Sequence, residues 1–170
     1  APTAGSNSKC GSGTVAISAT PGAGETIDWY GVSSGGSILA TGTPNPAQGT
    51  TSFTTPSIST TTNYYAEARN TTTGCLSSTR TTVTATVNTL PSAPTAGDNA
   101  RCGTGTVGIT ATPGAGETID WYGGSSGGSI LTTGSPNPAQ GTTSFTTPSI
   151  SSTTSYYAES RNTTTGCLSS

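Results

Sequence analysis

The chain has 170 residues, a formal net charge of −2, no histidine and only 7% charged residues. Charge this sparse forms no basic face, which excludes nucleic acid as an expected partner. No apolar run approaches the roughly 18 residues that a membrane-spanning helix requires, so no membrane span is predicted.

The sequence repeats itself once. Residues 1–78 and 93–170 differ at 12 of 78 positions, and the differences are mild, such as Lys9 against Arg101. A period of about 90 residues is too long for a solenoid unit and fits a complete domain of immunoglobulin size. We therefore predict two domains, residues 1–90 and 91–170, each of which closes its own core.

The first elements of the repeat read as short strands. Pro2–Gly5 predicts an edge strand limited by its proline. Gly13–Thr20 alternates apolar and small polar residues, which predicts a strand with one face turned inward: Val15, Ile17 and Ala19.

A strand over Thr26–Gly31 is the central element of the repeat, and it recurs unchanged at residues 118–123. Read with period two, its residues place Trp29 on the inner face and Asp28 and Tyr30 on the outer face. The chain has one tryptophan in each copy, so each repeat is expected to build a small core on that ring.

Three further segments complete the middle of the repeat. Ser37–Ala40 predicts a short strand after a glycine-rich turn, and residues 41–51 predict a proline-containing loop that crosses the end of the sheets. Ser52–Thr55 predicts a strand with Phe53 inward.

The repeat closes with a long strand and a hairpin. Asn63–Asn70 predicts a strand with Tyr64 inward and Tyr65 outward, near Tyr30 if the two strands are neighbours. A loop follows, and Cys75 is expected to open the last strand. About seven short strands with no helical periodicity predict an all-β fold, two tandem Ig-like antiparallel β-sandwiches.

Four cysteines occur as two per repeat, 65 residues apart in each: Cys10, Cys75, Cys102 and Cys167. The even count and equal spacing predict one disulfide within each repeat, with four free buried thiols as the alternative. Without histidine or a CxxC motif, neither a metal nor another cofactor is predicted. Disulfides would place the protein in an oxidising compartment, extracellular or at the cell surface.

The join between the repeats and the end of the second repeat bear on assembly. Pro91 and Pro94 stiffen the join, so a string of such domains is expected to form a semi-rigid rod. The second repeat stops at Ser170 and has no counterpart of Thr79–Leu90, the last strand of the first. Either the sequence is a fragment, or a neighbouring chain donates a strand to form a fibre.

Several spacings together resemble a known family. The residues, in chain order, are Cys10, Thr14-Val15, Asp28-Trp29-Tyr30, Phe53-Thr54-Thr55-Pro56, Tyr64-Tyr65-Ala66-Glu67, Gly74-Cys75 and Arg80-Thr81-Thr82-Val83. They resemble the Ig-like repeats of very large Bacteroidota surface proteins, adhesin-like proteins associated with gliding-motility-type sorting domains and type IX secretion. The resemblance implies an extracellular, non-enzymatic role in adhesion or fibre building, and it carries over no functional residues.

Two groups of residues are candidate sites. The first is a small charge group of Asp28, Glu67 and Arg69, repeated as Asp120, Glu159 and Arg161. Two carboxylates are the minimum for glycosidase chemistry. Because the group is duplicated and the chain has no histidine, we favour simple cross-strand pairing of these charges. A platform for sugar rings would use four tyrosines: Tyr30, Tyr65, Tyr122 and Tyr157.

We therefore expect a non-enzymatic structural repeat acting as a stalk, adhesin or fibre building block. Its expected partners are neighbouring copies of the same repeat, through strand donation. The alternative is a carbohydrate-binding module of a secreted enzyme, with glycans as the partner.

Overall fold

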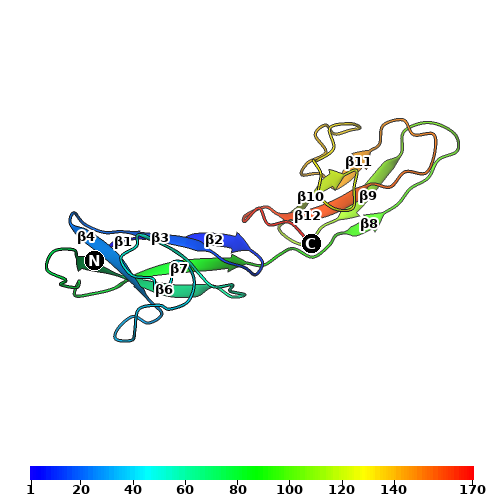
Figure 1. Ribbon diagram of the computed structural model, residues 1–170. Coiled ribbons are helices and arrows are strands. Elements are labelled where there is room, and N and C mark those ends of the chain that lie inside the picture. The colour runs from blue at the N-terminus through cyan, green and yellow to red at the C-terminus, as the bar shows by residue number, and fades with distance from the viewer. The chain divides into compact units, whose positions relative to one another are not determined.

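The computed structural model describes residues 1–170 as two compact units, Ala1–Asn88 and Thr89–Ser170 (Figure 1). Every regular element is a strand, which confirms the predicted all-β class. The strands are β1 (Thr3–Gly5), β2 (Asn7–Cys10), β3 (Ala16–Thr20), β4 (Glu25–Tyr30), β5 (Ser52–Thr54), β6 (Thr62–Asn70), β7 (Thr81–Asn88), β8 (Thr95–Gly97), β9 (Gly108–Thr112), β10 (Glu117–Tyr122), β11 (Ser144–Thr146) and β12 (Tyr157–Asn162).

The first unit is a sandwich of two sheets. One sheet has the order β1-β3-β5 and the other β2-β7-β6-β4. Every strand pair is antiparallel except β2 with β7, which run parallel. Seven short strands in two layers are the arrangement of an Ig-like domain, as the sequence predicts.

An aromatic stack lies between the two sheets of the first unit. The Trp29 ring stacks on Phe53 with centroids 5.7 Å apart, and Tyr64 meets Phe53 edge-on at 5.4 Å. The indole N–H donates to the carbonyl of Thr50 at 2.9 Å, so burying the ring leaves no donor unpaired. The inward positions predicted for Gly13–Thr20 are confirmed, because all three side chains are buried: Val15, Ile17 and Ala19.

The second unit repeats this core on five strands. Its sheets have the orders β11-β9-β8 and β10-β12. Trp121 stacks on Phe145 at 5.8 Å, and Tyr156 meets Phe145 edge-on at 5.4 Å. The same sequence pattern therefore produces the same core a second time.

Two predicted elements differ from the structure, and one strand of the structure was not predicted. Ser37–Ala40 is not a strand; it contributes only an isolated bridge between Ile38 and Tyr30. The last strand begins at Thr81 rather than Cys75. Strand β2 was not predicted, because its four polar residues show no alternation and it forms only by parallel pairing with the distant β7.

The predicted disulfide within each repeat is wrong. Cys10 and Cys167 are disulfide-bonded, whereas Cys75 and Cys102 carry free, exposed thiols. The expected pairs, Cys10 with Cys75 and Cys102 with Cys167, are therefore not formed.

The register of the first unit explains why. Cys10 lies beside Asn88 at one end of the four-stranded sheet. The carbonyl of Cys75 accepts a hydrogen bond from the N–H of Asn70, at the opposite end of β6. Three residues of β7 and eight of β6 separate these levels, roughly 35 Å at the strand rise. A disulfide needs Cα atoms within about 7 Å, so these two cysteines cannot meet inside one sandwich.

Candidate functional site

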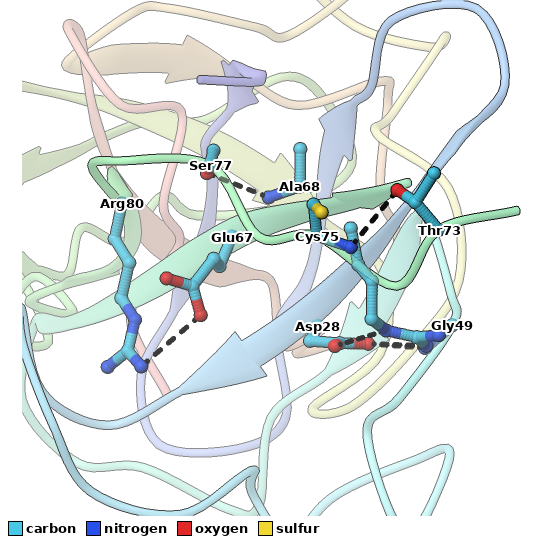
Figure 2. Close-up of polar contacts among 9 residues, drawn as sticks. Asp28, Gly49, Glu67, Ala68, Thr73, Cys75, Ser77 and Arg80 are labelled. Atoms are coloured by element: carbon cyan, nitrogen blue, oxygen red, sulfur yellow. Dashed lines mark hydrogen bonds and ion pairs between the residues drawn. The ribbon is translucent and has the colours of Figure 1, made fainter. Parts of the chain in front are cut away.

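The predicted charge group forms only in part, and its carboxylates are buried rather than exposed: Asp28 pairs with Arg69, whereas Glu67 lies beside Arg80. Arg69 Nε lies 2.8 Å from Asp28 Oδ2, and its Nη2 lies 3.1 Å from Oδ1. The backbone N–H of Gly49 donates to Oδ1 at 3.0 Å (Figure 2). Only 2% of the Asp28 side chain is exposed. Beside this carboxylate the pKa of Arg69 is raised by hydrogen bonding and by charge.

The outer edge of β4 is covered by the loop after it, which explains the burial of Asp28. The N–H of Trp29 donates to Ala47, and the N–H of Thr50 donates to Ile27. The loop therefore pairs with β4 in place of a further strand. Its Gly42 has φ of 86°, and a Cβ there would lie 2.6 Å from the Phe53 ring, so only glycine fits this approach.

Arg80 completes the polar face of the first unit, and the sequence analysis assigned it no role in a site. Its guanidinium carbon lies 3.3 Å from the centroid of the Tyr30 ring. One nitrogen donates to the carbonyls of Val32 at 2.9 Å and Gly35 at 2.7 Å. The other lies 3.4 Å from Glu67 Oε2, as Figure 2 shows. Both charged side chains are about nine-tenths buried. Arg80 thus ties the turn after β4 to the sheet.

The tyrosines expected to form a sugar platform lie together, but one is covered in the first unit. Tyr30 and Tyr65 are directly opposite each other on β4 and β6. Tyr30 is 6% exposed beneath the Arg80 guanidinium, and burial, the hydrogen bond to Glu67 and nearby carboxylates raise its pKa. In the first unit Arg80 covers the ring of Tyr30, so the two tyrosines do not form an uncovered pair that a sugar ring could stack on.

In the second unit the equivalent pair is more open. Tyr122 and Tyr157 are opposite each other, and Tyr157 is 40% exposed. Both line a shallow hollow of about 370 Å³ that also includes Glu159 and Leu168. Burial is the first cause that raises the pKa of Tyr122 to about 12, followed by the charges of Glu159 and Asp120.

A larger groove, of about 670 Å³, runs along the core of the second unit. Its apolar lining consists of Val107, Ile109, Trp121, Tyr156 and Ala158. In the first unit the equivalent residues are covered by β7, which contributes two fully buried side chains, Val83 and Ala85. The groove is therefore the space that a strand like β7 occupies.

The family follows from the sequence of both units together with this fold. The profile of the family described as Ig-like domain CHU_C associated matches residues 1–88 and again residues 91–170. The chain belongs to this family. It consists of two CHU_C-associated Ig-like domains in tandem.

Solved structures similar to the tandem Ig-like domains are distant in sequence. They include fibronectin(III)-like modules of Clostridium thermocellum CbhA (14% identity, 100% of this chain and 87% of that chain, TM-score 0.49). Murine CEACAM1b is similar over 99% of this chain and 94% of its own (16% identity, TM-score 0.42). Titin domains A168–A170 match 97% of this chain and 58% of theirs (16% identity, TM-score 0.45). No match was found among curated proteins.

The second CHU_C-associated Ig-like domain builds its polar face from the same parts as the first. Arg161 Nε lies 2.8 Å from Asp120 Oδ2, and the N–H of Gly141 donates to Oδ1 at 3.0 Å. This arginine–carboxylate pair is thus a property of the domain rather than of one copy. No helix long and apolar enough to cross a membrane is present.

Proposed function

We propose that these Ig-like domains are non-enzymatic structural repeats of an extracellular surface protein, where they act as a stalk, adhesin or fibre building block. The observation that carries this proposal is that the buried carboxylates make contacts within the fold. Asp28 is satisfied by Arg69 and a backbone N–H, and Glu67 lies beside Arg80. These carboxylates are held as structural groups in a protein core, not aimed at a shared reacting atom.

Three further features support the surface location. The chain holds disulfide-bonded cysteines, which persist in oxidising compartments. Its surface is rich in small hydroxylated residues, and the domain recurs in tandem. The resemblance to adhesin-like repeats of Bacteroidota points to the same setting.

A glycan array probed with the 170-residue chain tests the proposal against carbohydrate binding. We expect no selective binding, because Arg80 covers one of the two rings in the first unit. Selective binding that is lost in a Tyr30→Ala, Tyr65→Ala double variant would make the carbohydrate-binding module the better function. The matched variant Tyr122→Ala, Tyr157→Ala reports on the more open pair of the second unit.

The groove of the second unit supports one part of this proposal, which is that a neighbouring copy donates a strand. The groove is lined by the residues that β7 covers in the first unit. A strand from a neighbouring copy that alternates small apolar residues would therefore bury the exposed core and satisfy the free edge of β12.

A further inference from the structure

The first unit shows how this domain holds a guanidinium group. The guanidinium carbon of Arg80 lies 3.3 Å from the centroid of the Tyr30 ring. Its Nη1 donates to the carbonyl oxygens of Val32 at 2.9 Å and Gly35 at 2.7 Å. Its Nη2 lies 3.4 Å from Glu67 Oε2, as Figure 2 shows. One aromatic face, two carbonyls of a turn and one carboxylate therefore surround a single cation.

The second unit contains the same four groups. The repeats are offset by 92 residues (122 − 30), so the counterparts are Tyr122, Gly124, Gly127 and Glu159. All four line the hollow of about 370 Å³. Glycine in place of valine at the second position retains a backbone carbonyl, and φ is 63° at Gly127 as it is at Gly35. The turn that offers the two carbonyls thus has the same local conformation in both units.

These groups are more accessible in the second unit than in the first. Tyr30 is 6% exposed and Glu67 is 8% exposed. Their counterparts Tyr122 and Glu159 are only half-buried. The side chain of Arg80 therefore accounts for the cover in the first unit, and the hollow in the second unit has the place that this side chain fills.

The charge in the hollow is negative. Glu159 forms no salt bridge within residues 1–170, and the arginine two positions further along β12, Arg161, pairs with Asp120 instead. After burial, the charges of Glu159 and Asp120 are the next causes that raise the pKa of Tyr122. A cation that enters the hollow would meet a carboxylate that no other cation of the chain neutralises.

The arrangement of these groups selects a guanidinium among cations. A guanidinium is planar, so its face stacks on an aromatic ring while its N–H groups point outward in the plane towards acceptors on different sides. A lysine ammonium is a compact, strongly hydrated charge that does not match this geometry. The neutral urea group of citrulline has the guanidinium shape but brings no positive charge to the carboxylate.

We propose that the hollow of the second unit is a binding site for a guanidinium group carried by an arginine side chain. Tyr122 provides the stacking face, and Glu159 pairs with one nitrogen. The carbonyls of Gly124 and Gly127 accept hydrogen bonds from the other nitrogen. The arginine belongs to an extended peptide segment or to a small arginine derivative, since both present the same group.

Titration of the ¹⁵N-labelled 170-residue chain with N-acetyl-arginine amide tests the site by NMR. We expect saturable shifts of the amide signals of Gly124 and Gly127 with millimolar affinity. The first unit, where Arg80 is already in place, should not respond. N-acetyl-citrulline amide and N-acetyl-lysine amide are the matched probes and should produce no saturable shift. No saturable shift with the arginine probe, or equal shifts with the citrulline probe, would overturn the proposal.

Variants of the carboxylate and of Arg80 test the contacts. Glu159→Gln should weaken binding of the arginine probe about tenfold, because it removes a charge-assisted hydrogen bond. Glu67→Gln is the matched change in the first unit and should leave binding at the second unit unaltered. Arg80→Ala should open a second site, reported by the amide signal of Gly35. If Arg80→Ala unfolds the first unit, the Glu159→Gln comparison still decides, and unchanged affinity in that variant would overturn the assigned contacts.

A short peptide distinguishes the two sources of the arginine. The capped peptide Ser78–Thr82 presents Arg80 in its own sequence and lacks the apolar residues of β7. Tighter binding than the arginine amide would assign the site to an arginine of a polypeptide, and equal binding would assign it to a small arginine derivative. The same peptide with citrulline at the arginine position should not bind, and binding of both peptides alike would contradict the site.

This inference goes beyond the proposed function and does not depend on it. Selective glycan binding would change the function and leave the arginine titration as it is. Failure of the titration would remove the site and leave a structural role for the domains standing.

Discussion

Ser160 is the one residue at which the second domain carries a buried polar group without a partner. Its side chain is fully buried on the core face of β12, and its hydroxyl oxygen makes no hydrogen bond. The first domain has Ala68 at the equivalent position. In both domains the backbone N–H of this residue is satisfied by a serine hydroxyl, from Ser169 and Ser77 respectively. The hydroxyl of Ser160 is therefore the difference between this position in the second domain and the Ala68 position in the first.

Ser160→Ala should therefore stabilise the second domain by about 1 kcal/mol, because it removes an unpaired buried group. The reciprocal change Ala68→Ser should destabilise the first domain by about 1–3 kcal/mol. Urea unfolding monitored by the tryptophan of the affected domain, with the other tryptophan replaced by phenylalanine, measures both. A destabilising Ser160→Ala would show that the hydroxyl has a partner.

Tyr122 gives the second domain a pH dependence. Its pKa is raised to about 12, first by burial and then by Glu159 and Asp120, whereas in the unfolded chain it titrates near 10. Below pH 10 both states hold the proton, and this contribution to stability is complete. Between pH 10 and 12 only the folded state keeps it, so the free energy of unfolding falls as pH rises.

Tyr122→Phe should abolish this slope in the second domain while leaving its stability at pH 8 lowered by no more than about 1 kcal/mol. Spectrophotometric titration near 295 nm together with urea unfolding at pH 9 and 11 measures the effect. An unchanged slope in the variant would assign the pH dependence to another group.

At the scale of strands, the alternation of apolar and polar residues predicts which side chains pack in the core. It does not predict which backbone segments pair with one another. The inward positions of β3 and β4 follow from period two, and Val15, Ile17 and Trp29 are buried as predicted. The burial of Asp28 does not follow, because its cover comes from a loop whose pairing with β4 depends on tertiary contacts. Arg80 is in an irregular segment, and nothing local relates it to Glu67 or Tyr30.

The error over the cysteines has the same origin. Equal spacing shows that both repeats carry the same two residues, yet spacing along the chain says nothing about which end of a sandwich each occupies. That depends on β2, whose parallel pairing with β7 places Cys10 beside Asn88, at one end of the four-stranded sheet. A polar four-residue strand has no periodic signal, so the decisive element was invisible in the sequence.

The groove of the second domain should bind a peptide with the sequence of strand β7. A synthetic peptide with the sequence of Thr79–Leu90 should bind the 170-residue chain, because its alternating Val83 and Ala85 match the pocket that they fill in the first domain. Quenching or shift of Trp121 fluorescence in a Trp29→Phe background measures binding.

A peptide with Val83→Asp is the matched control and should not bind, since the charge would be buried against Trp121. Binding of both peptides alike would show that the contact is not the core groove. Binding of neither peptide would contradict the prediction.

For the whole molecule, the state of the four cysteines affects the stability of the fold. Cys10 and Cys167 are disulfide-bonded, whereas Cys75 and Cys102 are free and exposed. Alkylation of the unreduced chain should therefore label Cys75 and Cys102 alone, as mass spectrometry of the tryptic peptides would show. Urea unfolding with a reducing agent should give a lower free energy of unfolding than without it, because a disulfide restricts the unfolded chain. Equal labelling of all four cysteines would contradict this prediction.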